Sequence, residues 1–474
     1  MKALELKTIG TAIQSISPVK FFIVMAAVFG LVFIIIIPPF QGADEPLHFY
    51  RAYQVSTFNF VVDENVGRDF GGVLPSSLEN TVALTANNSN LGNLKPNEKY
   101  NIHTTSEALS IKETPSQREW VNFTATAPYP PVAYIPQATG VLIARILRAP
   151  PILMMYAGRL MNLTAWIVLL ALSIKIMPRK KWAFVFIGLL PVALTQAASL
   201  SADVMTIGLF ALFFATIMRS ILRTKPFTNL ELAGLLLIMV LLVLCKQISF
   251  VFLPLLLLIP SKAFGSKRKA YAIKAVFLLV SLAIYTTWLY IIRDLNFKSV
   301  FANHENPTQQ IHLIIHNPLG FINALWDSYF FSWGDVTTKS FIGTFGWGDT
   351  SLSELIVTMG YIGLFLVATI NPYNHLRRWV TKRQKIWLGI MGIVYWLAIT
   401  ATLYAYYNPV GAKTILGLQG RYFLPLGFIA IPLLYSNWLK SSKTAYKKIA
   451  VLVPLFLLLT SVVTIYFRYY INYA

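Results

Sequence analysis

An apolar run from Phe21 to Ile37 leads directly into Pro38-Pro39-Phe40-Gln41-Gly42-Ala43-Asp44-Glu45-Pro46-Leu47-His48-Phe49-Tyr50-Arg51. A double proline cannot continue a helix without losing backbone hydrogen bonds, so it marks where a first membrane span ends and an aqueous segment begins. Two carboxylates, an imidazole and a guanidinium therefore crowd one membrane surface, which favours a functional interpretation. The alternative is that Asp44 only caps a short helix, because Asp is a preferred N-cap and Pro46 suits a first helical turn.

Composition places the chain among polytopic membrane proteins. Hydrophobic residues make up 56% of the 474 residues and charged residues 12%, and apolar runs recur along most of the chain. The formal net charge is +21. Because the basic residues mostly cluster between apolar runs, the positive-inside rule explains this charge better than binding to nucleic acid does. The single Cys245 rules out an internal disulfide framework.

Basic segments divide the chain into about eleven predicted transmembrane helices of an all-α membrane protein, with two large outer segments that contain interfacial helices. Lys2, Lys7 and Lys20 place the N-terminus in the cytoplasm and make 1–37 a retained signal-anchor span. The expected divisions that follow are a first outer segment over 38–150, spans two to seven over 151–292, a second outer segment over 293–352 and spans eight to eleven over 353–474. Of the 19 acidic residues only Glu5 and Glu231 then fall on the cytoplasmic side, which supports this topology in the plasma membrane.

Two parts of this topology depend on the charge rule. Residues 131–148 are expected to lie in or dip into the interface, because a span there would place Pro178-Arg179-Lys180-Lys181 outside. Residues 230–260 are flanked by Lys225 and Lys262, so two short spans that meet near Lys246 are expected there. Span three is expected over 182–200 and span four over 204–222.

Three cations are expected to converge on the outer side of the bilayer. Arg159 lies two turns inside span two, Lys246 lies between two short spans, and Arg421 opens span ten. A charge at the centre of a span costs roughly 2.5 to 3.5 kcal/mol, so each of these residues needs a partner or a purpose. Together they suggest an anionic group held near the membrane surface, for which a lipid phosphate is the natural candidate. Arg159 has the alternative of extending its head group outward to the interface.

The second outer segment repeats one short pattern. Trp333-Gly334-Asp335 and Trp347-Gly348-Asp349 each place a flat aromatic ring beside a carboxylate, a combination suited to a sugar ring. An interfacial tryptophan belt is the alternative. His312 and His316 stand four residues apart in the same segment, but the usual ligand patterns argue against a metal site there.

Five sequence elements together resemble a family of bacterial polytopic membrane proteins described only as a domain of unknown function. They are the run from Pro38 to Phe49, Pro130-Pro131-x-x-Tyr134, Ser201-Ala202-Asp203, Gly343-x-Phe345-Gly346-Trp347, and Gln419-Gly420-Arg421-Tyr422-Phe423-Leu424-Pro425. The resemblance covers nearly the whole chain. That family in turn resembles the GT-C glycosyltransferases, such as protein mannosyltransferases and aminoarabinose transferases.

The resemblance implies a GT-C-like bundle with an acidic residue after the first span, interfacial helices in the first outer loop, and a lipid-phosphate sugar as donor. Asp44, Glu45, Pro130-Pro131 and Arg421 match that plan by position. One departure is expected, because no separate soluble domain follows span eleven. Acceptor recognition is therefore expected to come from the two outer segments.

These features predict an inverting membrane glycosyltransferase that takes a sugar from a polyprenyl phosphate on the outer leaflet. The acceptor would be a hydroxyl of a cell-envelope glycan or glycolipid. Asp44 is the expected general base, Glu45 is the runner-up or an orienting group, and His48 completes the catalytic set. The expected ligands of the donor phosphate are Arg421, Lys246 and Arg159. The expected sugar- or acceptor-binding residues are Arg51, Tyr129, Tyr134, Asp203, Trp333, Trp347 and Asp349.

Neither a cofactor nor a metal is required by this scheme, although a divalent cation at Asp44 and Glu45 is left open. A lipid-linked glycan transporter or flippase is the first rival, and it predicts transmembrane acids and paired broken helices in two similar halves. The acids of this chain lie in outer segments or at span mouths, and its halves show no repeat. A non-catalytic polysaccharide-assembly protein is the second rival, and it would leave the Asp44 group without a task.

Overall fold

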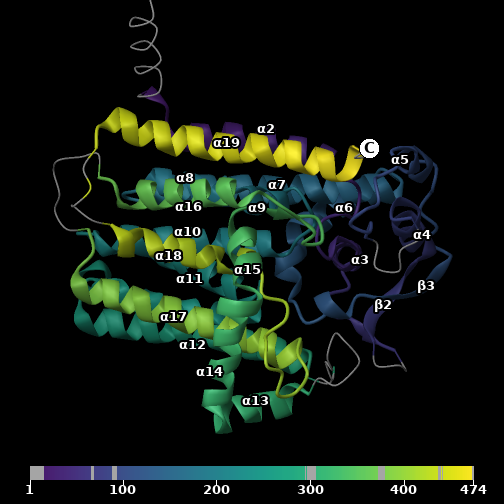
Figure 1. Ribbon diagram of the computed structural model, residues 1–474. Coiled ribbons are helices and arrows are strands. Elements are labelled where there is room, and N and C mark those ends of the chain that lie inside the picture. The colour runs from purple at the N-terminus through teal and green to yellow at the C-terminus, as the bar shows by residue number, and fades with distance from the viewer. Residues whose placement is uncertain are drawn as a thin grey trace, which may run out of the picture.

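The computed structural model describes residues 15–65, 69–87, 93–293, 295, 306–371, 379–435, 439 and 441–471. The long helices run side by side, and a small sheet with several short helices gathers at one end of the bundle (Figure 1). We call this end, which carries α3 (Glu45–Ser56) and the strands β2 and β3, the polar end. The predicted cytoplasmic N-terminus depends on Lys2, Glu5 and Lys7, which lie outside the described residues.

Six of the described helices are long and apolar enough to cross a membrane. They are α2 (Pro18–Ile36), α7 (Pro151–Ile176), α10 (Asp203–Ile221), α12 (Lys267–Ile291), α17 (Lys382–Tyr406) and α19 (Lys443–Tyr470). Shorter helical segments among them are α11 (Asn229–Val243), η3 (Gln247–Leu258), η4 (Ser261–Phe264), α16 (Glu354–Thr369), and η6 (Gly420–Phe423) continued by α18 (Leu424–Leu434). The protein is therefore a multi-pass membrane protein, but helix length alone does not confirm the expected eleven spans.

Helix α10 forms the centre of the bundle, where it packs against α7, α11 and α18. Nearly all of its side chains from Val204 to Ile221 are buried, as expected for a helix that is apolar on every side. The outer helices α2, α12 and α19 instead expose apolar side chains such as Ile35, Leu279 and Leu459. An exposed apolar surface of this kind suits contact with lipid.

The expected span over 182–200 is not one continuous helix, and this expectation is corrected. Helix α8 (Lys181–Gly188) ends before Pro191, and α9 (Pro191–Ala197) begins at it. Proline has no N–H and its ring clashes with the carbonyl four residues earlier, so it stops one helix and suits the first turn of the next. By contrast, the segment expected to break near Lys246 does so, because α11 and η3 meet there.

The first polar segment contains a sheet that the all-α expectation missed. Strands β1 (Asp63–Glu64), β2 (Phe70–Pro75) and β3 (Arg118–Asn122) pair antiparallel in the order β1-β2-β3. Gly71 lies opposite Asn122, and a Cβ at Gly71 would lie 2.0 Å from the carbonyl oxygen of Val121. Only glycine permits so close a pairing. The helices around the sheet are α4 (Ser76–Thr85), α5 (His103–Ala108), η1 (Thr124–Thr126), η2 (Pro131–Tyr134) and α6 (Ile135–Ile146).

The second polar segment positions the start of η6. It contains α13 (Pro307–His316), α14 (Pro318–Asp327), the π-helical turn η5 (Ser328–Ser332), α15 (Gly334–Ile342) and the hairpin of β4 (Thr344–Phe345) and β5 (Thr350–Ser351). Helix α15 contacts η6 so closely that a Cβ at Gly420 would lie 2.1 Å from the backbone nitrogen of Phe341. Glycine is therefore needed at position 420 for this contact. The contact in turn fixes the position of the backbone at Arg421.

Candidate functional site

Asp44 stands in the turn between Pro38-Pro39 and α3. Its backbone is left-handed, with φ 57° and ψ 17°, a conformation that costs about 1 to 3 kcal/mol for most residues and that Asp tolerates better than most. The side chain makes no capping hydrogen bond to α3. It is 44% exposed, and its Oδ2 lies 3.7 Å from Nη2 of Arg421. Helix capping therefore does not explain this carboxylate.

Asp44 belongs to a group of four charged side chains. Nζ of Lys246 lies 3.0 Å from Oδ1 of Asp203, and Nε of Arg421 lies 3.7 Å from Oδ2 of Asp203. These side chains come from the turn before α3, the first residue of α10, the junction between α11 and η3, and η6. We call Asp44, Asp203, Lys246 and Arg421 the charge cluster. The fold thus brings two of the predicted phosphate ligands to the predicted base.

The two carboxylates of the charge cluster have different surroundings. Asp203 is only 13% exposed and contacts both cations, so its charge is neutralised within the protein. Arg421 is buried, and its Nη1 donates a hydrogen bond to Oε1 of Gln196 at 3.1 Å. Its buried Nε makes no hydrogen bond to any residue that the structure describes. Because an unsatisfied buried donor is costly, an anion that accepted this N–H would be favoured.

Tyrosine rings surround the cations of the charge cluster. Nζ of Lys246 lies 5.3 Å from the ring centroid of Tyr129 and 5.0 Å from that of Tyr422, within the range of cation–π attraction. The guanidinium of Arg421 lies 5.2 Å from the ring of Tyr422. Burial raises the pKa of Tyr129, so its phenol stays protonated at neutral pH.

His48 lies behind the charge cluster, one turn into α3. Its Nδ1 forms a hydrogen bond with the hydroxyl of Tyr134 at 2.9 Å. Burial lowers the pKa of His48 to about 4, although the negative charges of Asp44 and Asp203 oppose this shift. The imidazole is therefore neutral at pH 7, so it is suited to hydrogen bonding and not to charge pairing with Asp44.

Glu45 points away from the charge cluster into the bundle. Arg159 binds its carboxylate with both sides of the guanidinium, through Nε to Oε1 at 2.7 Å and Nη2 to Oε2 at 2.6 Å. Both side chains are fully buried. The remaining donors of Arg159 reach the carbonyl oxygens of Ile34, Ile37 and Pro38. Arg159 thus ties α7 to the end of α2, and its donors are already used within the protein.

A divalent cation shared by Asp44 and Glu45 does not fit this arrangement. Besides Arg159, Oε1 of Glu45 accepts from the backbone N–H of Leu200 and Oε2 from that of Gly42. Neither oxygen is left for a metal ion. No group of three or more His, Cys, Asp or Glu in the described ranges is placed to hold a metal ion.

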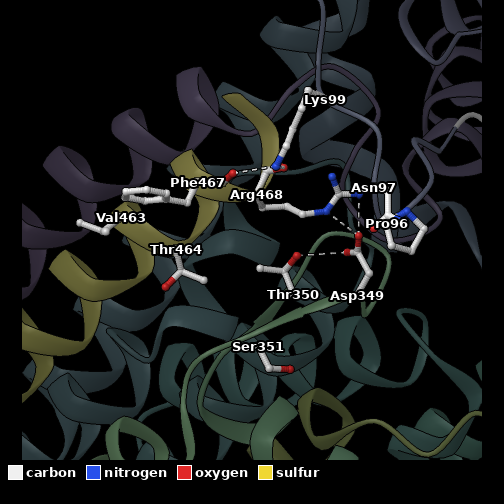
Figure 2. Close-up of a pocket in the computed structure, with 10 residues that line it drawn as sticks. All are labelled: Pro96, Asn97, Lys99, Asp349, Thr350, Ser351, Val463, Thr464, Phe467 and Arg468. Carbon is white, nitrogen blue, oxygen red and sulfur yellow. Dashed lines mark hydrogen bonds and ion pairs between the residues drawn. The ribbon is translucent and has the colours of Figure 1, made fainter. Parts of the chain in front are cut away.

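The remaining predicted ligands are distributed over different parts of the protein. Arg51 is buried and donates to the carbonyl oxygens of Phe60 and Tyr129, so it supports the loop that carries Tyr129. Trp333 packs in an apolar cluster with α14, α17 and the η6 residues Tyr422 and Phe423 that follow Arg421. Asp349, two residues after Trp347, pairs with Arg468 of α19 at 2.7 Å (Figure 2). The two Trp-Gly-Asp patterns therefore have different surroundings, one beside η6 and the other with its carboxylate on α19.

Two residues of the site were not predicted from the sequence. Gln196 lies on α9 and accepts from Arg421, and Tyr422 lines the cations beside it. The sequence does indicate that Gln196 is unusual, because a buried amide within the apolar stretch Leu189–Ala198 needs a hydrogen-bond partner. Its partner could not be read from the sequence, because the two residues are 225 positions apart.

Apolar helices and a charged group at one end of the bundle define a multi-pass membrane protein with a polar site at one end of its helices. The chain belongs to the family described as "Predicted membrane protein (DUF2142)", whose match covers residues 27–430 and includes the whole charge cluster. No curated protein matches the chain.

Among solved structures, the chain is similar to the oligosaccharyltransferase of Archaeoglobus fulgidus, determined in complex with zinc and sulfate. The identity is 13% and the TM-score 0.40, over 94% of this chain and 52% of that one. The chain thus spans about half the length of that enzyme.

Proposed function

We propose that the protein is an inverting membrane glycosyltransferase that moves a sugar from a polyprenyl phosphate to a hydroxyl of a cell-envelope glycan or glycolipid. The reaction would take place at the outer face of the plasma membrane. One observation carries the proposal, which is that the accessible carboxylate of Asp44 lies beside the buried cation Arg421. A carboxylate able to act as a base is thus adjacent to a cation able to bind an anion.

Asp44 accepts the proton of the acceptor hydroxyl while the acceptor oxygen attacks the anomeric carbon of the sugar. The bond from that carbon to the phosphate oxygen breaks, and the phosphate leaves with the bonding electrons. Attack from the face opposite the phosphate inverts the anomeric configuration. No second acid is needed, because a phosphate is a good leaving group.

Arg421 and Lys246 stabilise the negative charge that grows on the departing phosphate. Arg421 offers its Nε, which has no hydrogen-bond partner among the described residues, and Lys246 lies beside it across Asp203. Asp203 serves as the residue that holds both cations in place. This assignment favours Asp44 over Asp203 as the base, because a carboxylate already paired with two cations is a weaker proton acceptor.

Glu45 and Arg159 support the site without touching the substrate. Their buried pair joins α2, α7 and the turn before α10 to the backbone beside Asp44. The strained backbone of Asp44 requires such a support, because strain persists only where the surroundings over-determine it.

The proposal is tested by incubating the purified protein with a polyprenyl-phosphate sugar and envelope glycolipid extracted from a deletion strain. We expect a glycosylated lipid whose anomeric linkage, measured by NMR, is inverted relative to the donor. The same protein in sealed vesicles would only move the intact donor across the bilayer if the flippase alternative held. Donor translocation without cleavage would therefore contradict the proposed reaction.

A further inference from the structure

A cavity lies beside the C-terminal end of α19, and its lining does not include the charge cluster. Its volume is about 650 Å³, within the range of ligand pockets. The loop with Asn97 and Lys99 forms one wall, the β4–β5 hairpin with Asp349 and Ser351 forms another, and α19 with Phe467 and Arg468 closes it (Figure 2). None of the four residues of the charge cluster lines it.

The charged groups of this cavity give it a positive balance. Arg468 donates through Nε to Oδ2 of Asp349 at 2.7 Å and through Nη1 to the carbonyl oxygen of Glu98 at 2.7 Å. Nζ of Lys99 donates to the carbonyl oxygens of Phe467 and Arg468. Two cations thus stand against one carboxylate in the cavity wall. Partial burial lowers the pKa of Lys99, and the nearby charge of Arg468 adds to this shift.

The cavity opens beside an apolar stripe of α19. Leu459, Val463, Tyr466 and Phe467 are exposed, and their spacing places them on one face of the helix. Tyr466 stacks on Tyr470 near the end of α19, with ring centroids 5.4 Å apart, and such aromatic side chains are enriched at membrane interfaces. A charged pocket therefore adjoins an exposed apolar face of a helix that is long and apolar enough to cross a membrane.

We propose that this cavity binds the phosphate head group of an anionic phospholipid from the leaflet at the polar end, with its tail along the exposed face of α19. Lys99 supplies the charge, and the side chains of Asn97 and Ser351 supply hydrogen-bond donors to the phosphate oxygens. Asp349 holds Arg468 in the wall of the cavity. The site does not depend on the proposed transfer reaction, because it is separate from the charge cluster.

Binding is measured on the full-length protein purified in a neutral detergent. Short-chain phosphatidylglycerol, short-chain phosphatidylcholine and inorganic phosphate are each titrated, and bound ligand is followed by native mass spectrometry and by the unfolding temperature. We expect saturable binding of phosphatidylglycerol that is at least about tenfold tighter than that of the other two ligands. Equal affinity for phosphatidylcholine would overturn the requirement for negative charge, and equal affinity for inorganic phosphate would assign the pocket to a soluble anion and not to a lipid.

Three variants locate the site. Lys99→Gln should weaken the binding of phosphatidylglycerol about tenfold, because one charge-assisted contact is lost. Asn97→Trp should weaken it as much by filling the cavity from an exposed loop, without touching the carbonyl contacts of Lys99. Lys112→Gln removes a charge from an exposed position of the same polar segment and should change nothing. Unchanged binding in both Lys99→Gln and Asn97→Trp would remove the site, whatever the transfer assay shows.

Discussion

Asp44 and Glu45 are adjacent in the chain, yet their carboxylates pair with different arginines on opposite sides of the turn. Oδ2 of Asp44 lies 3.7 Å from Arg421 and remains open to solvent, whereas Oε2 of Glu45 lies 2.6 Å from Arg159 and is fully buried. The first arrangement leaves a carboxylate available for chemistry. The second arrangement binds three parts of the bundle together. We therefore expect substitution of Asp44 to lower activity and substitution of Glu45 to lower stability.

Asp44→Asn should lower sugar transfer by at least about 10² while leaving the unfolding temperature nearly unchanged, because only the proton acceptor is lost. Transfer is measured with a polyprenyl-phosphate sugar, and stability by thermal unfolding in detergent. Asp63→Asn is the matched control, since Asp63 is exposed on β1. Near-normal transfer by Asp44→Asn would assign the base to another residue.

Glu45→Gln should instead destabilise the protein by about 3 to 5 kcal/mol, because it leaves Arg159 as a buried cation without its partner. The measurement is the unfolding midpoint in detergent, compared with Glu113→Gln, which breaks the partly exposed pair with Arg145. A variant that folds as well as the wild type but has lost transfer would show that Glu45 acts in catalysis.

Arg421→Lys should reduce transfer and Arg421→Ala should nearly abolish it. Lysine keeps the positive charge but loses the planar pair of donors, including the Nε that no described residue satisfies. The loss should fall on donor turnover more than on folding, which the unfolding temperature reports. If Arg421 only extended its charge to the interface, lysine would replace it with full transfer activity.

Asp203 and Lys246 should behave as a coupled pair. Each of Asp203→Asn and Lys246→Gln leaves one charge of a close pair unmatched, so the double variant should lose less stability than the sum of the two single losses. We expect a coupling energy of about 0.5 to 3 kcal/mol from thermal unfolding of the four proteins. Additive losses would mean that the 3.0 Å contact contributes nothing in solution.

His48 should make the protein less stable as the pH falls. Its pKa is about 4 in the folded protein, below the ordinary value of 6.5, so the unfolded chain takes up the proton first. Stability from neutral His48 is complete above pH 6.5 and is lost progressively between pH 6.5 and about 4. The difference in unfolding temperature between wild type and His48→Gln should shrink across that window. A constant difference from pH 7 to pH 5 would contradict a buried neutral imidazole.

The proposed orientation is tested with single cysteines at two exposed positions. Ser110→Cys lies in the first polar segment and should react with an impermeant thiol reagent in intact cells. Thr224→Cys lies in the exposed turn after α10 and should react only after permeabilisation. The parent protein with its buried Cys245 serves as the background. Labelling of Thr224→Cys in intact cells would reverse the orientation.

Much of the membrane character was readable without a structure, because apolar runs and flanking charges are local properties of the chain. The end of the first span at Pro38-Pro39 and the break near Lys246 follow from such local signals. The stretch 182–200 is apolar throughout and therefore predicts one span, but Pro191 interrupts it. A single proline changes the hydropathy of the stretch very little, although it ends a helix. The sheet was missed because its strands are short and its longest one contains two glycines.

By itself the sequence determined which side chains are chemically able to act. It placed Asp44 and Asp203 at the ends of spans, and Lys246 and Arg421 where an unpaired charge is costly. Only the tertiary structure decided their partners, because Arg421 meets Gln196 and Asp203 across more than 200 positions of sequence. It also paired Glu45 with Arg159, apart from the charge cluster. Those pairings depend on how α7, α9, α10 and η6 pack, and packing between distant helices leaves no mark in the local pattern of residues.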